Sequence, residues 1–222
     1  MTNGNTSPSL QVLGVLAIKR GLDLVTELDK SGKLEPWQLD LWQHLIYEFF
    51  LSYNALAAWC QEGNIAGSAW MTRNILELVV WVAFCARSRD DAKRFYDDKA
   101  RDTFEFLDAI EGLTKLLDER DTNVSSLLDE TRKRIAVRAE AEGYENIDET
   151  YQRVKEAAQQ VGLGPFFLSM NKLLSKFAHP TAMMVFSFPD EPSRTQFCVF
   201  FIAAATVLCT AAMAEFEQYT RK

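Results

Sequence analysis

Near the C-terminus, eighteen consecutive residues from Phe197 to Ala214 carry no charged side chain. The stretch approaches the roughly 20 apolar residues that a helix needs to cross a bilayer, so it must be buried in either lipid or protein. Six alanines and two threonines make it only weakly lipophilic, and no basic loop flanks it. It therefore predicts a central helix buried inside a folded protein, and we expect no membrane contact.

The rest of the chain predicts helices as well. Apolar residues recur at helical spacing, strand patterns are almost absent, and six prolines and ten glycines are few for a turn-rich β-protein. Start and stop signals predict helices over about 8–30, 36–61, 65–87, 88–120, 122–142, 148–161 and 165–179, the sixth capped by Asp148 and the seventh halted by Pro180. A proline-containing loop, 186–192, leads to the long apolar helix. The fold class is an all-α bundle of about seven to eight helices.

Charge is concentrated in the middle of the chain. Residues 87–156 hold 33 of the 55 charged side chains, 14 basic and 19 acidic. Faces of mixed sign are typical of solvent-exposed amphipathic helices. We therefore predict one all-helical domain over 1–222, with core helices at about 8–87 and 165–220 and a charged helical insertion at about 88–161. The net charge of −7 disfavours RNA or DNA as a general partner, although a local basic patch leaves RNA open.

Cysteine usage and the N-terminus indicate a cytoplasmic protein. The four cysteines form no C-x-x-C pair and lie in apolar neighbourhoods, as is typical of buried thiols in a reducing compartment. The first eight residues, MTNGNTSP, lack the basic and apolar regions of a signal peptide.

Cofactor and metal motifs are missing from the sequence. It contains no G-x-x-x-x-G-K-[ST], G-x-G-x-x-G, G-x-S-x-G, H-E-x-x-H or E-x-x-H pattern, and it has only two histidines. We predict no metal site and no cofactor.

The predicted helix 65–87 carries an unusual pair of charges in an apolar setting. At 100° per residue, Arg73 and Glu77 share a stripe with Trp70, Trp81 and Phe84. Because a helix that is apolar all round is buried, both charges should be partly desolvated, which is costly unless they are paired. Two interpretations remain open: an Arg–Glu pair that merely orients the bundle, or a polar site in which Arg73 holds an anion or orients Glu77.

The predicted helix 165–179 presents a second polar stripe. Lys172, Ser175, Lys176 and His179 fall within about 100° of one another, opposite an apolar arc. The stripe is suited to a phosphate or carboxylate, with His179 as a general acid or base. Alternatively it is a solvated face whose histidine is favoured by the helix dipole. The other histidine, His44, is expected to be a packed, hydrogen-bonded side chain.

Three segments together resemble a bacterial family of unknown function. They are 68–77 (SAWMTRNILE), 162–167 (GLGPFF) and 174–181 (LSKFAHPT). Members of that family show an R-x-x-x-E helix, a charged helical middle and a helix ending in L-S-x-x-x-H-P, a pattern that covers roughly residues 40–215 here. The family is similar in outline to HEPN-type helical bundles, many of which are toxins or phage-defence proteins.

The resemblance carries expectations for the site and for assembly. Active HEPN ribonucleases place an arginine four to six residues before a histidine on one helix, usually in a dimer. Here no arginine precedes His179 at that spacing, and Lys172 and Lys176 are the nearby cations. The resemblance implies that Arg73, Glu77 and His179 converge on one site. Together with the apolar C-terminal helix, it also implies a homodimer.

Three functions follow from these patterns. The first, favoured by the missing arginine and the absence of cofactor motifs, is a non-catalytic bundle that contacts a partner protein in a defence or stress setting. The second is a metal-independent ribonuclease or phosphotransfer enzyme that uses His179, with Arg73 or Lys176 steadying the phosphate. The third is a small anionic ligand site lined by Arg73, Trp70 and Trp81.

Overall fold

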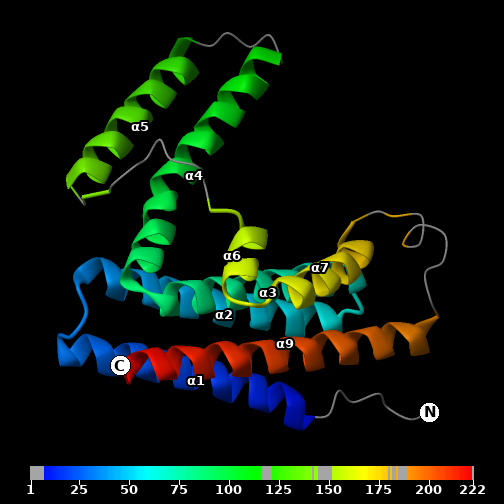
Figure 1. Cartoon of the computed structure of the whole chain (residues 1–222). Coiled ribbons are helices and arrows are strands. Elements are labelled where there is room, and N and C mark those ends of the chain that lie inside the picture. Colours follow the sequence, from blue (N-terminus) through cyan, green and yellow to red (C-terminus); the bar gives the residue numbers. More distant parts are fainter. Residues whose placement is uncertain are drawn as a thin grey trace. The chain divides into compact units, whose positions relative to one another are not determined.

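The computed structural model describes residues 8–116, 122–141, 143–144, 152–179, 181, 184 and 190–221. These residues form eight helices and no strand, which confirms the all-α prediction (Figure 1). The helices are α1 (Pro8–Ser31), α2 (Pro36–Gln61), α3 (Ile65–Arg87), α4 (Arg89–Leu116), α5 (Thr122–Ala141), α6 (Val154–Gln160), α7 (Gly164–Ala178) and α9 (Glu191–Thr220). The predicted loop at 186–192 lies largely outside the described residues.

The chain divides into two compact units. The first unit comprises residues 1–92 and 153–222, and the second comprises residues 93–152. The charged segment predicted over about 88–161 therefore contains the second unit and a few residues of the first on either side.

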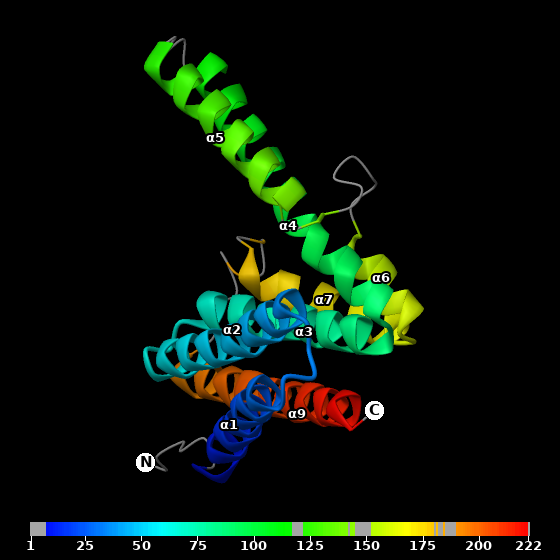
Figure 2. The ribbon, with the colours of Figure 1, turned by 90° about the vertical axis from the view of Figure 1, so that its left-hand side faces the viewer.

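In the first unit, α3 and α9 form the centre of the bundle. The helix α3 packs against α2, α6, α7 and α9, while α9 also packs against α1 and α2. Figures 1 and 2 show α9 running beside α1. Large side chains from four helices fill the space between them: Trp42, Phe49, Tyr53, Leu56, Ile75, Leu76, Phe84, Leu174, Phe201 and Phe216.

Two of these helices, α3 and α9, are long and apolar enough to cross a membrane. For each helix we consider the 18-residue window of highest hydropathy. The buried share of that window is 56% in α3 and 50% in α9. Buried core helices satisfy the same criterion, so length and composition alone do not distinguish the two.

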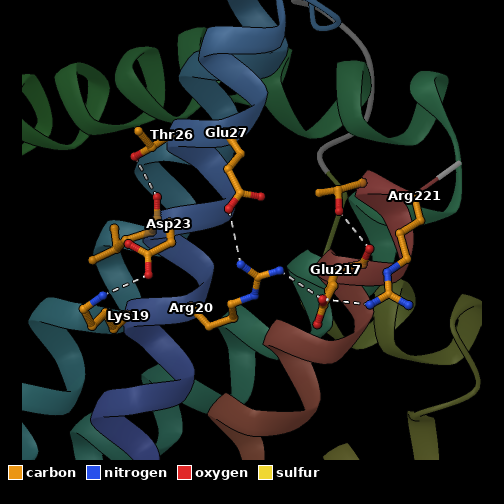
Figure 3. A network of polar contacts seen from close by, with 9 residues as sticks. Lys19, Arg20, Asp23, Thr26, Glu27, Glu217 and Arg221 are labelled. Carbon is orange, nitrogen blue, oxygen red and sulfur yellow. Dashed lines mark hydrogen bonds and ion pairs between the residues drawn. The ribbon is translucent and has the colours of Figure 1, made fainter.

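Charged side chains connect α1 and α9 at the surface. Arg20 contacts both Glu27 and Glu217, and Glu217 also pairs with Arg221 (Figure 3). Because exposed ion pairs contribute about 0–1 kcal/mol each, they add little to the stability that the buried side chains provide.

Local signals fix where α3 begins. Gly63 adopts φ 68°, a left-handed conformation that ends α2, and the Asn64 side chain accepts a hydrogen bond from the Gly67 amide at 2.9 Å. A Cβ atom at Gly67 would overlap the Trp59 ring, so only glycine allows this close approach of α2 and α3.

The sixth helix is shorter than predicted. Gln152 and Arg153 are not helical, and α6 begins at Val154 rather than near residue 148. Asp148, the predicted cap, lies outside the described residues. The helix α6 ends at Gln160, and Gly162, with φ 77°, redirects the chain into α7.

The second unit is a charged helical pair formed by α4 from residue 93 onward and α5. Arg132 of α5 donates to Asp108 at 2.8 Å and to Glu111 at 2.7 Å, both on α4. Leu107 and Leu128 are among its few buried apolar side chains. Ion pairs therefore supply much of the contact between the two helices.

Candidate functional site

Three polar or aromatic side chains of the site come from α3. Trp70, Arg73 and Glu77 lie on one stripe of this helix, whose other faces pack against the neighbouring helices. Arg73 Nε donates to Glu77 Oε1 at 3.1 Å, and the two side chains are 28% and 30% exposed. Trp70 is 44% exposed, which leaves much of its indole on the surface. The pair is therefore partly desolvated but reachable from solvent.

The fourth member, His179, lies directly after α7. Its amide donates to the Ser175 carbonyl at 3.4 Å, and its own backbone is extended, with φ −109° and ψ 154°. The chain thus leaves the helix at His179, where the sequence predicts the end. Pro180, to which the prediction assigned this break, lies outside the described residues.

The packing of α7 against α3 brings His179 to the Arg73–Glu77 pair. Arg73 Nη1 lies 3.5 Å from His179 Nε2. The His179 ring meets Trp70 edge to face, with centroids 6.0 Å apart and an interplanar angle of 85°. We call Trp70, Arg73, Glu77 and His179 the histidine site.

The contact with Arg73 defines the role of the imidazole. A guanidinium only donates hydrogen bonds, so in a hydrogen bond with Arg73 the acceptor is Nε2 of His179, in the tautomer that has its proton on Nδ1. An anion held by Arg73 would lie next to this nitrogen.

The remaining predicted residues lie outside this contact group. Lys172 and Lys176 are exposed on α7 and make no ion pair with the described residues, whereas Ser175 is half-buried. Trp81 is only 9% exposed and meets Phe84 edge to face, with centroids 6.0 Å apart, so it belongs to the core. The structure thus places Trp81 apart from Trp70, although both share one angular stripe.

The second histidine lies away from this site and differs from its prediction. His44 Nδ1 contacts the Asp40 carbonyl at 2.8 Å and the Asp40 carboxylate at 3.2 Å, so it is hydrogen-bonded as expected. Its side chain is 73% exposed, however, and is therefore not packed.

Among the residues that the structure describes, no three His, Cys, Asp or Glu side chains are grouped so that they would hold a metal ion.

A cleft of about 510 Å³ opens between α3, the α6–α7 turn and α9, with Arg87, Gln160 and Glu215 among its lining residues. The sequence did not predict this cleft, because alanines are also common in the core of a helical bundle. The alanines that line the cleft are the sequence signal that could have indicated it.

Comparison with known proteins gives one match. The model of DUF5677, a family of unknown function, matches residues 43–194, which include all four residues of the histidine site. No curated protein and no solved structure matches the chain.

Proposed function

The chain belongs to DUF5677, a family of unknown function, and we propose that its histidine site binds single-stranded RNA and cleaves it without a metal ion. The observation that carries the proposal is the 3.5 Å approach of Arg73 Nη1 to His179 Nε2, beside an exposed indole. The resemblance to HEPN-type bundles supports the same substrate.

Each group has a part in recognition. Arg73 Nη2 has no partner among the described residues, so it is available for a phosphate oxygen, while Glu77 holds the guanidinium through Nε. The exposed Trp70 ring offers a face on which an unpaired base stacks, a contact worth about 1–3 kcal/mol. Lys172 and Lys176 add positive charge on α7, which counters the acidic balance of the chain locally.

The proposed reaction is an internal transfer. The 2′-hydroxyl oxygen attacks the phosphorus held by Arg73, and its proton passes to Nε2 of His179, whose lone pair becomes free when Arg73 Nη1 turns from it to a phosphate oxygen. The bond from phosphorus to the 5′-oxygen breaks, and that oxygen takes a proton from water. The products are a 2′,3′-cyclic phosphate and a free 5′-hydroxyl.

The test is incubation of the purified protein with mixed single-stranded RNA oligonucleotides in EDTA. We expect cleavage to cyclic-phosphate ends, and His179→Ala should lower kcat at least about 100-fold, the range of a lost general base. The matched control is His44→Ala, which removes the other exposed histidine and should leave kcat unchanged. Trp70→Ala should weaken RNA binding more than it lowers kcat.

Two results would refute this function. One is wild-type protein that neither cleaves RNA nor binds it in a salt-dependent way by fluorescence anisotropy. The other is a His179→Ala variant that cleaves as fast as the wild type. Because His179 is exposed, its alanine variant should melt within a few degrees of the wild type.

A second function, contact with a partner protein in a defence or stress response, has its own support in the second unit. Phe106 and Leu113 lie seven residues apart on one face of α4 and are 64% and 59% exposed. Exposed apolar side chains on a charged helix are typical of a protein interface. A homodimer, which the HEPN resemblance implies, would be such a contact. Light scattering that shows only monomer, together with a pull-down that recovers no partner, would exclude this function.

A further inference from the structure

The cleft between α3, the α6–α7 turn and α9 has the dimensions of a ligand site. Its volume of about 510 Å³ is within the range of small-molecule pockets. Its walls are small or aliphatic: Ala83 and Ala86 from α3, Ala211 and Ala212 from α9, and Leu163 before α7. All of these residues belong to the first unit.

A smaller apolar hollow adjoins the cleft. It measures about 140 Å³ and shares Val79, Leu163 and Ala211 with the larger cleft. Phe166 and Val207 line its outer side, and every residue that lines it is apolar. The two hollows adjoin at these three residues; the larger one has polar residues at its mouth, and the smaller one is apolar throughout.

The mouth of the cleft has one unengaged charge. Arg87 donates to both carboxylate oxygens of Asp91 and to the carbonyl and Oε1 of Gln160, which uses four of its five N–H groups. Glu215 also lines the mouth but makes no hydrogen bond or ion pair with the described residues. The group that remains to meet a ligand is a carboxylate.

We propose that this cleft binds an organic cation: a primary amine attached to an aliphatic or other apolar body. The ammonium group pairs with Glu215, and the amide nitrogen of Gln160 offers a donor to any oxygen on the ligand. The apolar body occupies the smaller hollow beside Val79 and Phe166, where burial of each methylene is favourable. A carboxylate at the same position would be repelled by Glu215, so the charge at the mouth selects against anionic lipids and fatty acids.

The experiment compares three probes of equal chain length, octylamine, octanoate and 1-octanol, by the thermal midpoint of unfolding. At about ten times its dissociation constant, octylamine should raise Tm by about 3–6 °C. 1-Octanol should give a smaller shift, because it supplies the apolar contact without the charge. Octanoate should give none.

Two variants identify the site. Glu215→Gln should abolish the advantage of octylamine over 1-octanol, whereas the control Glu48→Gln, at an exposed position of α2, should keep it. Ala211→Trp fills the cleft and should remove the shifts with octylamine and 1-octanol. Ala214→Trp, one turn away on α9 and outside the cleft, should not.

The outcomes separate the proposal from its alternatives. No shift with octylamine, or an equal shift in Ala211→Trp, would overturn the cleft as the binding site. Equal shifts with octylamine and octanoate would overturn the role of Glu215. If Ala211→Trp did not fold, the comparison of Glu215→Gln with Glu48→Gln would still decide the question.

Discussion

A buried pair of hydroxyl groups joins three helices of the bundle, and its contribution to stability is open to measurement. Tyr53 Oη of α2 lies 2.7 Å from Thr206 Oγ1 of α9, and Thr206 Oγ1 donates to the Leu10 carbonyl of α1 at 3.1 Å. With the hydroxyl hydrogen of Thr206 on the Leu10 carbonyl, Tyr53 is the donor to Thr206; Tyr53 Oη also lies 3.5 Å from the Gln11 carbonyl, a longer contact. Burial raises the pKa of Tyr53, so its phenol keeps that proton at neutral pH.

The two partners should differ in cost. Tyr53→Phe removes one donor and leaves the bond from Thr206 to Leu10 intact, so it should lower the free energy of unfolding by about 1 kcal/mol. Thr206→Val removes the acceptor of Tyr53 and also the side-chain donor to the Leu10 carbonyl, so two hydrogen bonds are lost. We expect a loss of about 2 kcal/mol. In the double variant the shared bond is lost only once, so the total should be about 2 rather than 3 kcal/mol.

The assay is urea unfolding followed by circular dichroism and tryptophan fluorescence. Tyr47→Phe is the matched control, because Tyr47 is half-exposed on the same helix and its hydroxyl makes no hydrogen bond with the described residues. Its effect should lie within about 0.5 kcal/mol of zero. Additive effects of the Tyr53 and Thr206 substitutions would refute the reasoning, as would a Tyr53→Phe variant as stable as Tyr47→Phe.

Three other substitutions test how closely α1 approaches α2 and how burial changes the charge of one carboxylate. Gly14→Ala should destabilise the first unit by about 1–3 kcal/mol in urea, because the new Cβ would overlap the buried Tyr53 ring. Gly112→Ala, with nothing within 4 Å, should gain helix stability instead, and an unaffected Gly14→Ala would contradict the close packing. Burial raises the pKa of Asp98 to about 6 from an ordinary value of 3.8, so its stabilising contribution is complete below about pH 3.8 and disappears as the pH rises through 6. Allowing for its half-exposed position, Asp98→Asn should slow hydrogen exchange in α4 about fivefold at pH 7.5 and leave it unchanged at pH 4; equal exchange at pH 7.5 would contradict the burial.

Helix bounds were predictable wherever the stop signal is local. The predicted ranges 36–61 and 65–87 coincide with α2 and α3, because Pro36 and the Gly63–Asn64 pair determine backbone conformation within one or two residues. The start of α6 was not predictable in this way. The amide of Gln152 donates to the Asp98 carboxylate, 54 residues earlier in the chain, and this tertiary bond accompanies the extended backbone before Val154. Helical propensity over residues 148–153 contains no information about that partner.

In the candidate site, too, contacts within one helix were predictable from the sequence, whereas contacts between helices were not. The Arg73–Glu77 pair follows from a spacing of four residues on one helix, so the sequence alone predicts it. The approach of His179 depends on how α7 packs against α3, which no local pattern specifies; only the family resemblance implied it. The two tryptophans differ for a related reason. Trp70 and Trp81 are close in angle but lie eleven residues apart, and burial varies along the axis of α3 as well as around it.

In the folded protein, the uncharged stretch from Phe197 to Ala214 contributes both to the core and to the wall of the cleft. Phe201 and Ala205 face the other helices and supply core, which accounts for the absence of charge on that side. Ala211 and Ala212 lie along the cleft, where a larger side chain would fill the space that the amine is proposed to occupy. A stretch selected only for lipid or core burial would favour leucine and isoleucine at these positions, since each added methylene contributes about 0.8 kcal/mol. Two of the six alanines in the stretch, Ala211 and Ala212, are thus the residues of α9 that keep the cleft open.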